Sequence, residues 1–220
     1  MTDSLSRQRW AVLRAAHLIP VLRYRDAETA LYAAQVALRA GCRGIELTWT
    51  IPGVLDVLKA VRADAELAER GDVLIGVGTV LDAEQARQAL EAGADFLVAP
   101  GVVAPLVELA RAAGALSMLG AFTPTEILAA RAAGADVVKI FPADTGGPGH
   151  LAALKAVFPD TLFCPTGGIT RENMAAYFRA GAEIVGMGSN LFDKQKLAAR
   201  DTDALVAQLR ATVEEAAASR

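Results

Sequence analysis

The chain has 220 residues, 53% of them hydrophobic, with a formal net charge of −3 and an isoelectric point near 5.5. This length fits one large domain or two small ones, and the weak negative charge gives no electrostatic reason to expect nucleic acid or an anionic membrane as a partner. No apolar run approaches the roughly 20 residues of a membrane-spanning helix, and the N-terminal segment lacks the apolar core of a signal peptide.

One unit recurs along the chain: an alanine-rich, helix-like segment ends in glycine, and a short apolar strand follows. It occurs as RAGCRGIELTW, EAGADFLVAPG, RAAGALSMLGAF, RAAGADVVKIFP and RAGAEIVGMGS. The glycine stands where a helix ends in a left-handed residue, at Gly41, Gly93, Gly114, Gly134 and Gly181. The apolar runs are often continuous rather than alternating, which is typical of parallel strands buried on both faces.

In chain order, the sequence predicts an N-terminal helix over 3–15 and then eight strand–helix units. Strands are expected at 18–24, 43–49, 73–79, 95–100, 116–122, 136–142, 161–167 and 183–189. Helices are expected at 27–40, 53–69, 82–92, 103–113, 124–133, 149–157, 171–180 and 201–218. Capping signals support three helix starts, at Asp82, at TPTE (123–126) and at TREN (170–173). Residues 190–200 are expected to form a loop or an extra turn.

Eight alternations without a polar linker favour one closed (β/α)₈ barrel, a TIM barrel, over an open doubly wound sheet. We therefore predict a single α/β domain over residues 1–220, with the active site at the C-terminal ends of the strands. The expected strand ends are unusually polar and carry Arg23, Glu46, Thr48, Thr50, Thr79, Lys139, Thr166 and Ser189.

Lys139 stands out among these residues because it lies inside the apolar run ADVVKIFPAD, at 135–144. Buried charges are rare unless they are paired, so one interpretation is a structural ion pair with a carboxylate such as Glu46. The other is a Schiff-base lysine, because desolvation disfavours an ammonium ion and makes a free amine available as a nucleophile. The two interpretations are compatible, since a resting enzyme can hold a Lys139–Glu46 pair.

Glycine-rich turns follow the last two expected strands, as PTGG (165–168) and GMGS (186–189). Barrels commonly bind phosphate at these two loops, where glycine lets backbone N–H groups approach the anion. Either turn alone could be no more than a tight turn, but the two together indicate a phosphate site.

The cysteines and histidines argue against disulfides and against a protein-built zinc site. Cys42 and Cys164 both lie in strand-like runs, so we expect two reduced, buried thiols in a cytoplasmic protein. His17 and His150 are the only histidines and are far apart in the sequence, so no Cys/His ligand cluster is formed. We expect neither a metal nor another cofactor.

The motifs GIELT, GVGTV, VAPG, VKIFPA, CPTGG and GMGS, in this order, resemble the 2-keto-3-deoxy-6-phosphogluconate (KDPG) aldolase family, over about residues 18 to 195. That family also includes 4-hydroxy-2-oxoglutarate (KHG) aldolase and 2-keto-3-deoxy-6-phosphogalactonate aldolase. The resemblance implies a metal-independent class I aldolase on a (β/α)₈ barrel, usually a homotrimer. Its substrate would be a 2-keto-3-deoxy-6-phospho sugar acid, cleaved to pyruvate and glyceraldehyde 3-phosphate.

The resemblance also assigns roles to matching positions. It implies Lys139 as the Schiff-base residue and Glu46 as the general acid/base. It implies contacts to the pyruvyl carboxylate and neighbouring oxygens by Thr79 and Thr166. The walls of the pyruvate pocket match Pro100 and Phe141, and the phosphate end matches Gly167, Gly168, Gly188 and Ser189. Thr48 and Thr50 are expected on the same strand face as Glu46, facing the mouth.

One position departs from the gluconate-type pattern. Gluconate-type aldolases carry an arginine four residues after the catalytic glutamate, where this chain has Thr50, in ELTWTIPG. Galactonate-type relatives also lack that arginine but have one at the end of the first strand, as Arg23 stands here. We expect Arg23 to anchor the substrate carboxylate, unless it faces outward and pairs with Asp26 or Glu28 at the following helix start.

Three other functions stay open at this point, together with the C4 configuration of the sugar acid. An aldolase for an unphosphorylated 2-keto acid, such as 4-hydroxy-2-oxoglutarate, would differ only in its distal contacts. A sugar-phosphate isomerase or epimerase would use the same phosphate loops without needing Lys139. A non-catalytic ligand-binding barrel would keep the pocket but form no imine.

Overall fold

The computed structural model describes residues 4–64, 72–188 and 190–220. Eight parallel strands form one curved sheet in the order β7-β6-β5-β4-β3-β2-β1-β8. An isolated parallel bridge between Thr166 and Gly186 joins the last two strands across the remaining gap. The strands are β1 Leu18–Leu22, β2 Gly44–Thr48, β3 Leu74–Gly78, β4 Phe96–Val98, β5 Leu116–Ala121, β6 Val137–Ile140, β7 Phe163–Pro165 and β8 Val185–Met187. The predicted TIM barrel is confirmed.

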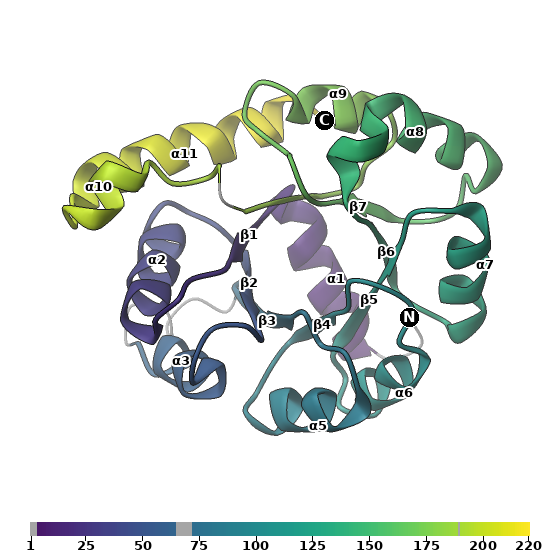
Figure 1. Ribbon diagram of the computed structural model, residues 1–220, viewed down its shortest axis with the longest axis horizontal. Helices are drawn as coiled ribbons and strands as arrows, with labels where there is room; N and C mark the ends of the chain where they lie inside the picture. Colours follow the sequence, from purple (N-terminus) through teal and green to yellow (C-terminus); the bar gives the residue numbers. More distant parts are fainter. Residues whose placement is uncertain (1–3, 65–71, 189) are drawn as a thin grey trace.

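Helices surround the strands on the outside of the barrel (Figure 1). In the described ranges they are α1 Ser4–Ala16, α2 Ala27–Arg39, α3 Val54–Arg62, α5 Ala83–Glu91, α6 Ala104–Ala112, α7 Pro124–Ala133, α8 Ala143–Val157, α9 Met174–Arg179, α10 Lys194–Ala198 and α11 Thr202–Ala218. The short helix α10 lies within 190–200, where a loop or an extra turn was expected. None of the described helices is both long and apolar enough to span a membrane.

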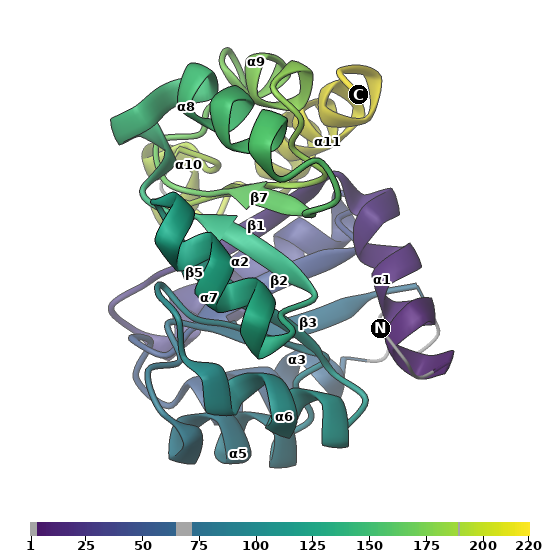
Figure 2. The same cartoon turned by 90° about the vertical axis from the view of Figure 1, so that its right-hand side faces the viewer.

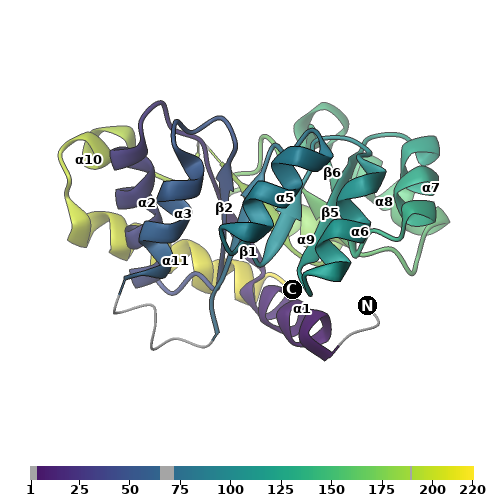
Figure 3. The same ribbon diagram turned by 90° about the horizontal axis from the view of Figure 1, so that it is seen from below.

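The N-terminal helix α1 does not belong to the outer ring. Figure 1 shows it crossing the barrel axis, and Figures 2 and 3 show it at one end of the barrel. Leu13 of α1 is fully buried and packs over Gly44, the first residue of β2, where an added Cβ would lie 2.6 Å from a Leu13 methyl carbon. The helix therefore covers the N-terminal ends of the strands and leaves their C-terminal ends open.

Apolar side chains fill both the barrel interior and the space between strands and helices. The interior cluster includes Leu13, Phe96, Met118, Val137 and Cys164. A Cβ on Gly76 would lie 2.2 Å from the ring of Phe96, so only glycine leaves room for this ring inside the barrel. This packed layer closes the lower barrel, and the polar side chains predicted for the active site lie at the other end.

Several predicted helix ends are confirmed by the backbone. All five repeat glycines have positive φ, between 65° and 102°: Gly41, Gly93, Gly114, Gly134 and Gly181. Asp82 caps α5 by accepting a hydrogen bond from the Gln85 N–H at 2.8 Å. Thr123 and Glu126 form a reciprocal capping box at the start of α7.

Three helix boundaries differ from the prediction. Helix α8 begins at Ala143 rather than 149, but the non-helical Gly147 (φ 69°, ψ −177°) before Pro148 divides it, and the predicted helix matches the part after this kink. Helix α9 begins at Met174 rather than 171. Its TREN segment forms a turn in which the side chains of Thr170 and Asn173 accept each other's backbone N–H. Helix α3 ends at Arg62, and residues 65–69 of the predicted helix lie outside the described residues.

Candidate active site

The C-terminal ends of the strands surround a cavity of about 420 Å³. Most residues predicted for the site line it: Arg23, Thr79, Pro100, Lys139, Phe141, Thr166, Gly167, Gly168 and Gly188. Three further lining residues, Val21, Ile169 and Asn190, were not predicted. Strand and loop positions from all around the barrel therefore converge on one pocket, as the barrel topology requires.

Lys139 and Glu46 form the buried centre of the site. The Lys139 Nζ lies 3.6 Å from the Glu46 Oε1, and only 7% and 4% of the two side chains are exposed. This separation fits an ion pair but exceeds an ordinary hydrogen bond. The Glu46 Oε1 is buried and accepts no hydrogen bond from any residue that the structure describes. A buried carboxylate oxygen without such a bond is costly to maintain, so this atom is available to a proton from a bound molecule.

The backbone of β3 makes room for the glutamate. Glu46 passes over Gly78, where an added Cβ would lie 1.9 Å from the Oε1. Any side chain at this position would displace the carboxylate, so the glycine of GVGTV fixes where the carboxylate stands relative to Lys139.

Apolar and neutral groups surround the amine. The Lys139 Nζ lies 5.3 Å from the centre of the Phe141 ring, within the range of a cation–π contact. Cys164 is the register partner of Lys139 on β7. Burial raises the pKa of the Cys164 thiol to about 12, so at neutral pH the thiol carries no charge. The amine is therefore the nucleophile that this part of the pocket offers.

Arg23 faces the mouth of the barrel. Its two terminal nitrogens donate to the hydroxyls of Thr50, at 3.2 Å, and Thr79, at 3.0 Å. Thr79 has a φ of 59°, a left-handed conformation that is uncommon for a β-branched residue. This turn at the end of β3 places its hydroxyl within reach of the guanidinium, which stands beside the cavity.

The outward alternative for Arg23 is wrong, because its guanidinium donates to Thr50 and Thr79 and not to the two acidic residues considered as its partners. Asp26 caps α2 by accepting a hydrogen bond from the Thr29 N–H at 2.7 Å. Glu28 pairs with Arg200 at 2.7 Å. The guanidinium is therefore held on the side of the site.

Thr48 and Thr50 form a support for Arg23 and do not line the cavity. Thr48 is fully buried and donates to the Leu22 carbonyl at 3.0 Å. Its hydroxyl also shares a hydrogen bond of 2.9 Å with the hydroxyl of Thr50. A chain of hydrogen bonds thus runs from β1 through the two threonines to the guanidinium.

The glycine turns after β7 and β8 line the same cavity. Gly167 and Gly168 have φ values of 95° and 68°, and a Cβ on Gly168 would lie 2.2 Å from the Cβ of Asp144. Gly188 lines the same cavity after β8, whereas Ser189 lies outside the described residues. Backbone rather than side chain faces the cavity at these positions, which suits an anion held by N–H groups.

Donors for a metal ion are sparse. In the described parts of the chain, no three His, Cys, Asp or Glu side chains come together in a group that could hold a metal. The charged groups at the cavity are instead Lys139, its partner Glu46, and Arg23.

Comparison with known proteins places this geometry in a family. The model for KDPG and KHG aldolase matches residues 10–208. The chain is 36% identical over 176 residues to a probable 2-dehydro-3-deoxy-6-phosphogalactonate aldolase of Rhizobium meliloti, which covers 80% of this chain and 81% of the relative. It is 34% identical over 203 residues to a 2-dehydro-3-deoxy-phosphogluconate aldolase of Treponema pallidum, covering 92% of this chain and 94% of that one.

A solved structure agrees with this placement. A KDPG aldolase from Legionella pneumophila, with pyruvate captured as a covalent carbinolamine intermediate, superposes with a TM-score of 0.80. The two sequences are 26% identical, and the superposition covers 96% of this chain and 99% of the other.

Proposed function

The chain belongs to the KDPG and KHG aldolase family, and from this premise we propose that it cleaves a 2-keto-3-deoxy-6-phospho sugar acid to pyruvate and glyceraldehyde 3-phosphate. The observation that carries the proposal is the buried Lys139–Glu46 contact of 3.6 Å at the C-terminal end of the barrel. It places a nucleophilic amine and a proton acceptor side by side, so that both can reach the reacting carbons of one substrate molecule.

Lys139 performs the covalent step. Its neutral amine attacks the C2 ketone of the substrate, and loss of water from the carbinolamine leaves an imine. The imine withdraws electrons when the C3–C4 bond breaks, so the reaction needs no metal to stabilise the carbanion.

Glu46 moves the protons. It accepts the proton of the C4 hydroxyl, directly or through water, as the C3–C4 bond breaks and the aldehyde leaves. The bond's electrons pass into the imine and form an enamine. Glu46 then returns a proton to C3, and hydrolysis of the imine releases pyruvate. Its unpartnered Oε1 next to the amine supports this role.

Arg23 anchors the substrate carboxylate beside the imine. A carboxylate in a mostly apolar mouth needs charged donors, and a guanidinium can bind it bidentately. Thr79 and Thr166 supply hydroxyls at the same cavity, with Pro100 and Phe141 as its apolar wall. The phosphate binds at the turns after β7 and β8, against Gly167, Gly168, Gly188 and Ser189.

The hydrogen bond between Arg23 and Thr50 favours the galactonate-type substrate. It places a guanidinium from the end of β1 against the position where gluconate-type aldolases have their own arginine. Because this arginine comes from a different strand, it contacts the substrate from another side. The substrate is then held in a different orientation, and this affects which configuration is accepted at C4.

We extend the proposal to the assembly and location of the protein. Family resemblance supports a homotrimer, and the two buried thiols, Cys42 and Cys164, fit a reducing, cytoplasmic environment. The single sheet supports one domain over residues 1–220. Sedimentation equilibrium tests the trimer, and a single cooperative unfolding transition tests the domain.

A cleavage assay with four substrates tests the activity. The gluconate- and galactonate-type keto acids are each supplied with and without the 6-phosphate, and pyruvate release is measured. We expect the highest kcat/KM for the phosphorylated galactonate type. Preference for the unphosphorylated acids would favour a KHG-type aldolase, whereas no release of pyruvate from any of them would contradict an aldolase and leave an isomerase, an epimerase or a binding protein.

A further inference from the structure

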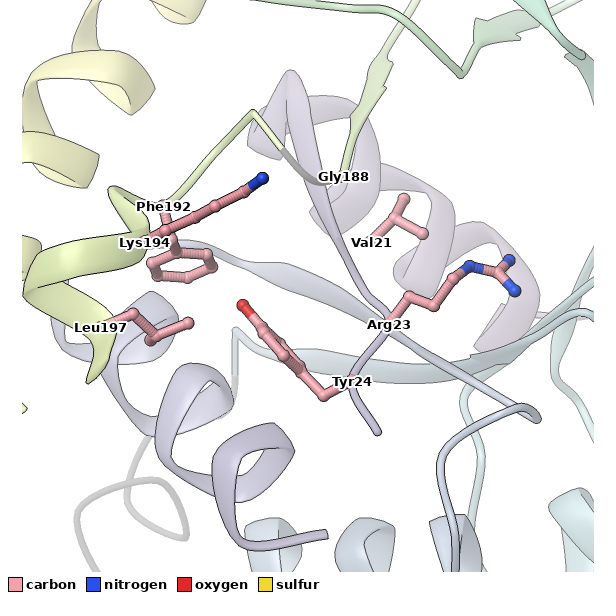
Figure 4. Close-up of a pocket in the computed structure, with 7 residues that line it drawn as sticks. All are labelled: Val21, Arg23, Tyr24, Gly188, Phe192, Lys194 and Leu197. Atoms are coloured by element: carbon pink, nitrogen blue, oxygen red, sulfur yellow. The ribbon is translucent and has the colours of Figure 1, made fainter. Parts of the chain in front are cut away.

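A second cavity of about 300 Å³ adjoins the first, between the end of β1, the loop after β8 and helix α10 (Figure 4). The two cavities share three lining residues, Val21, Arg23 and Gly188, so they meet at the glycine end of the site. The second cavity adds Tyr24 and Lys194 over an apolar floor formed by Phe192 and Leu197.

At the glycine end of the main cavity, the one cation among the described lining residues is Arg23, which borders both cavities together with Gly188. The rest of the described lining there includes glycine backbone, Ile169 and the neutral side chains of Thr166 and Asn190. Both described cations of the main cavity are engaged by other groups: Lys139 pairs with Glu46, and Arg23 bonds to Thr50 and Thr79 and is assigned to the substrate carboxylate. A phosphate group that leaves water for this end would therefore meet N–H dipoles but no cation that is free of another partner.

Lys194 stands where such a cation is needed. Figure 4 shows its side chain extended along the cavity toward the loop at Gly188. No residue in the described parts of the chain forms an ion pair with Lys194. The adjacent carboxylate of Asp193 instead accepts hydrogen bonds of 2.9 Å from the backbone N–H groups of Gln195 and Lys196. The ammonium group is thus uncommitted and faces a backbone suited to anions.

Tyr24 provides a neutral donor on the opposite wall. Its hydroxyl points toward the side of the cavity formed by Phe192 and Lys194 (Figure 4). Burial raises the pKa of Tyr24 to about 12, so the phenol stays protonated at neutral pH and repels no anion.

We propose that Lys194 supplies the charge that binds the distal phosphate of the substrate at Gly188, with the second cavity admitting that end of the molecule. This inference rests on the proposed aldolase function and deepens it. It makes Lys194 a specificity residue that selects phosphorylated over unphosphorylated keto acids. An ammonium on a flexible stem, arriving from α10, neutralises the phosphate while the glycine N–H groups orient it.

The test compares Lys194→Met with Lys196→Met, a matched loss of one lysine from the same short helix at an exposed position outside both cavities. The readout is the ratio of kcat/KM for a phosphorylated keto acid to kcat/KM for the same acid without phosphate. Lys194→Met should lower this ratio by about 10- to 100-fold, the worth of a charge-assisted hydrogen bond. Lys196→Met should not change it, and Lys194→Arg should restore most of it.

Equal ratios in the wild type, Lys194→Met and Lys196→Met would overturn the inference, as would a fall in both rates that leaves the ratio unchanged. If the wild type cleaves none of the acids, the proposed function fails by itself. Lys194 is then judged by calorimetric titration with inorganic phosphate, which should bind the wild type and Lys196→Met more tightly than Lys194→Met.

Discussion

Proton transfer at the scale of single residues depends on Glu46. Glu46→Gln keeps the side-chain volume but removes the base, so solvent exchange of the pyruvate methyl protons should slow by on the order of 10²–10⁴-fold. Proton NMR in deuterated water measures the exchange. The variant should still form the pyruvate imine, because Lys139 is intact. An unchanged exchange rate would assign the proton to another group.

Binding of the substrate carboxylate is a second property that depends on a single residue, Arg23. Arg23→Ala removes a charged donor held at 3.2 Å and 3.0 Å from the hydroxyls of Thr50 and Thr79. It should weaken pyruvate binding by about 1.5–3 kcal/mol, the usual range for a hydrogen bond to a charged group. The pyruvate concentration needed for half-maximal imine trapping measures this.

Arg25→Ala is the matched control for Arg23, because Arg25 is an exposed arginine two residues further along the chain that does not line the cavity. Equal pyruvate affinity in both variants would mean that threonines and backbone hold the carboxylate alone.

The side chains on regular strands were predictable at this scale, because strand alternation and parallel topology fix where they point. Glu46 on β2 and Lys139 on β6 were placed in this way, whereas Thr48 and Thr50, predicted on the same face as Glu46, do not line the cavity. Arg23 has a long, flexible side chain at a strand end, so the sequence left its direction open until the hydrogen bonds to two threonines decided it.

At the scale of whole elements, helix α1 is the clearest departure from the repeating strand–helix pattern, because it covers the lower end of the barrel instead of joining the outer ring. Arg9 of this helix pairs with the buried Asp95 at 2.9 Å. Asp95 also accepts from the Ile75 N–H at 2.9 Å and pairs with Arg62 of α3. One carboxylate at the start of β4 therefore joins α1, α3 and β3.

The packing of α1 predicts a stability effect without a change in chemistry. Leu13→Ala should lower the free energy of unfolding by about 2–5 kcal/mol, because it leaves a cavity in the barrel interior. Urea unfolding at fixed protein concentration measures this. Leu5→Ala, at a position on the same helix that is 42% exposed, should cost much less. Equal losses would mean that α1 does not stabilise the barrel through Leu13.

Helix boundaries show where sequence patterns reach their limit. The capping signals at Asp82 and Thr123 act through one hydrogen bond to a backbone N–H three residues on, so they could be recognised directly. Thr170 offered the same signal, but its side chain and that of Asn173 accept each other's backbone N–H in a turn, and α9 begins only after this turn. Residues 190–200 have no clear periodicity, and Asn190 and Lys194 were missed there for that reason.

The barrel as a whole was predictable because its eight units repeat one pattern and each level of the pattern agrees with the others. Apolar runs, helix-ending glycines and the lack of linkers all indicated a parallel sheet, and the eight even repeats favoured a closed one over an open one. The shape of the mouth was not predictable, because it depends on how separate loops meet. Val21, Ile169 and Asn190 line it without belonging to any motif.

Metal independence is a prediction about the whole molecule. The imine stabilises the carbanion that a metal would otherwise stabilise, and the described residues offer no group of three or more metal-binding side chains. Cleavage activity should survive EDTA treatment and gel filtration without loss. Activity that disappears with the chelator and returns with Mg²⁺ or Mn²⁺ would point to a metal-dependent aldolase mechanism instead.

The measurement that tests the account most directly is borohydride reduction in the presence of pyruvate, followed by peptide mapping. The account predicts one carboxyethyl group per chain, attached to the Nζ of Lys139, together with loss of cleavage activity. Lys139→Arg is the control and should stay unmodified and inactive, since a guanidinium remains protonated and forms no imine. A wild-type protein that cleaves the keto acid but gains no adduct on Lys139, or a Lys139→Arg variant that retains substantial turnover, would contradict the Schiff-base mechanism.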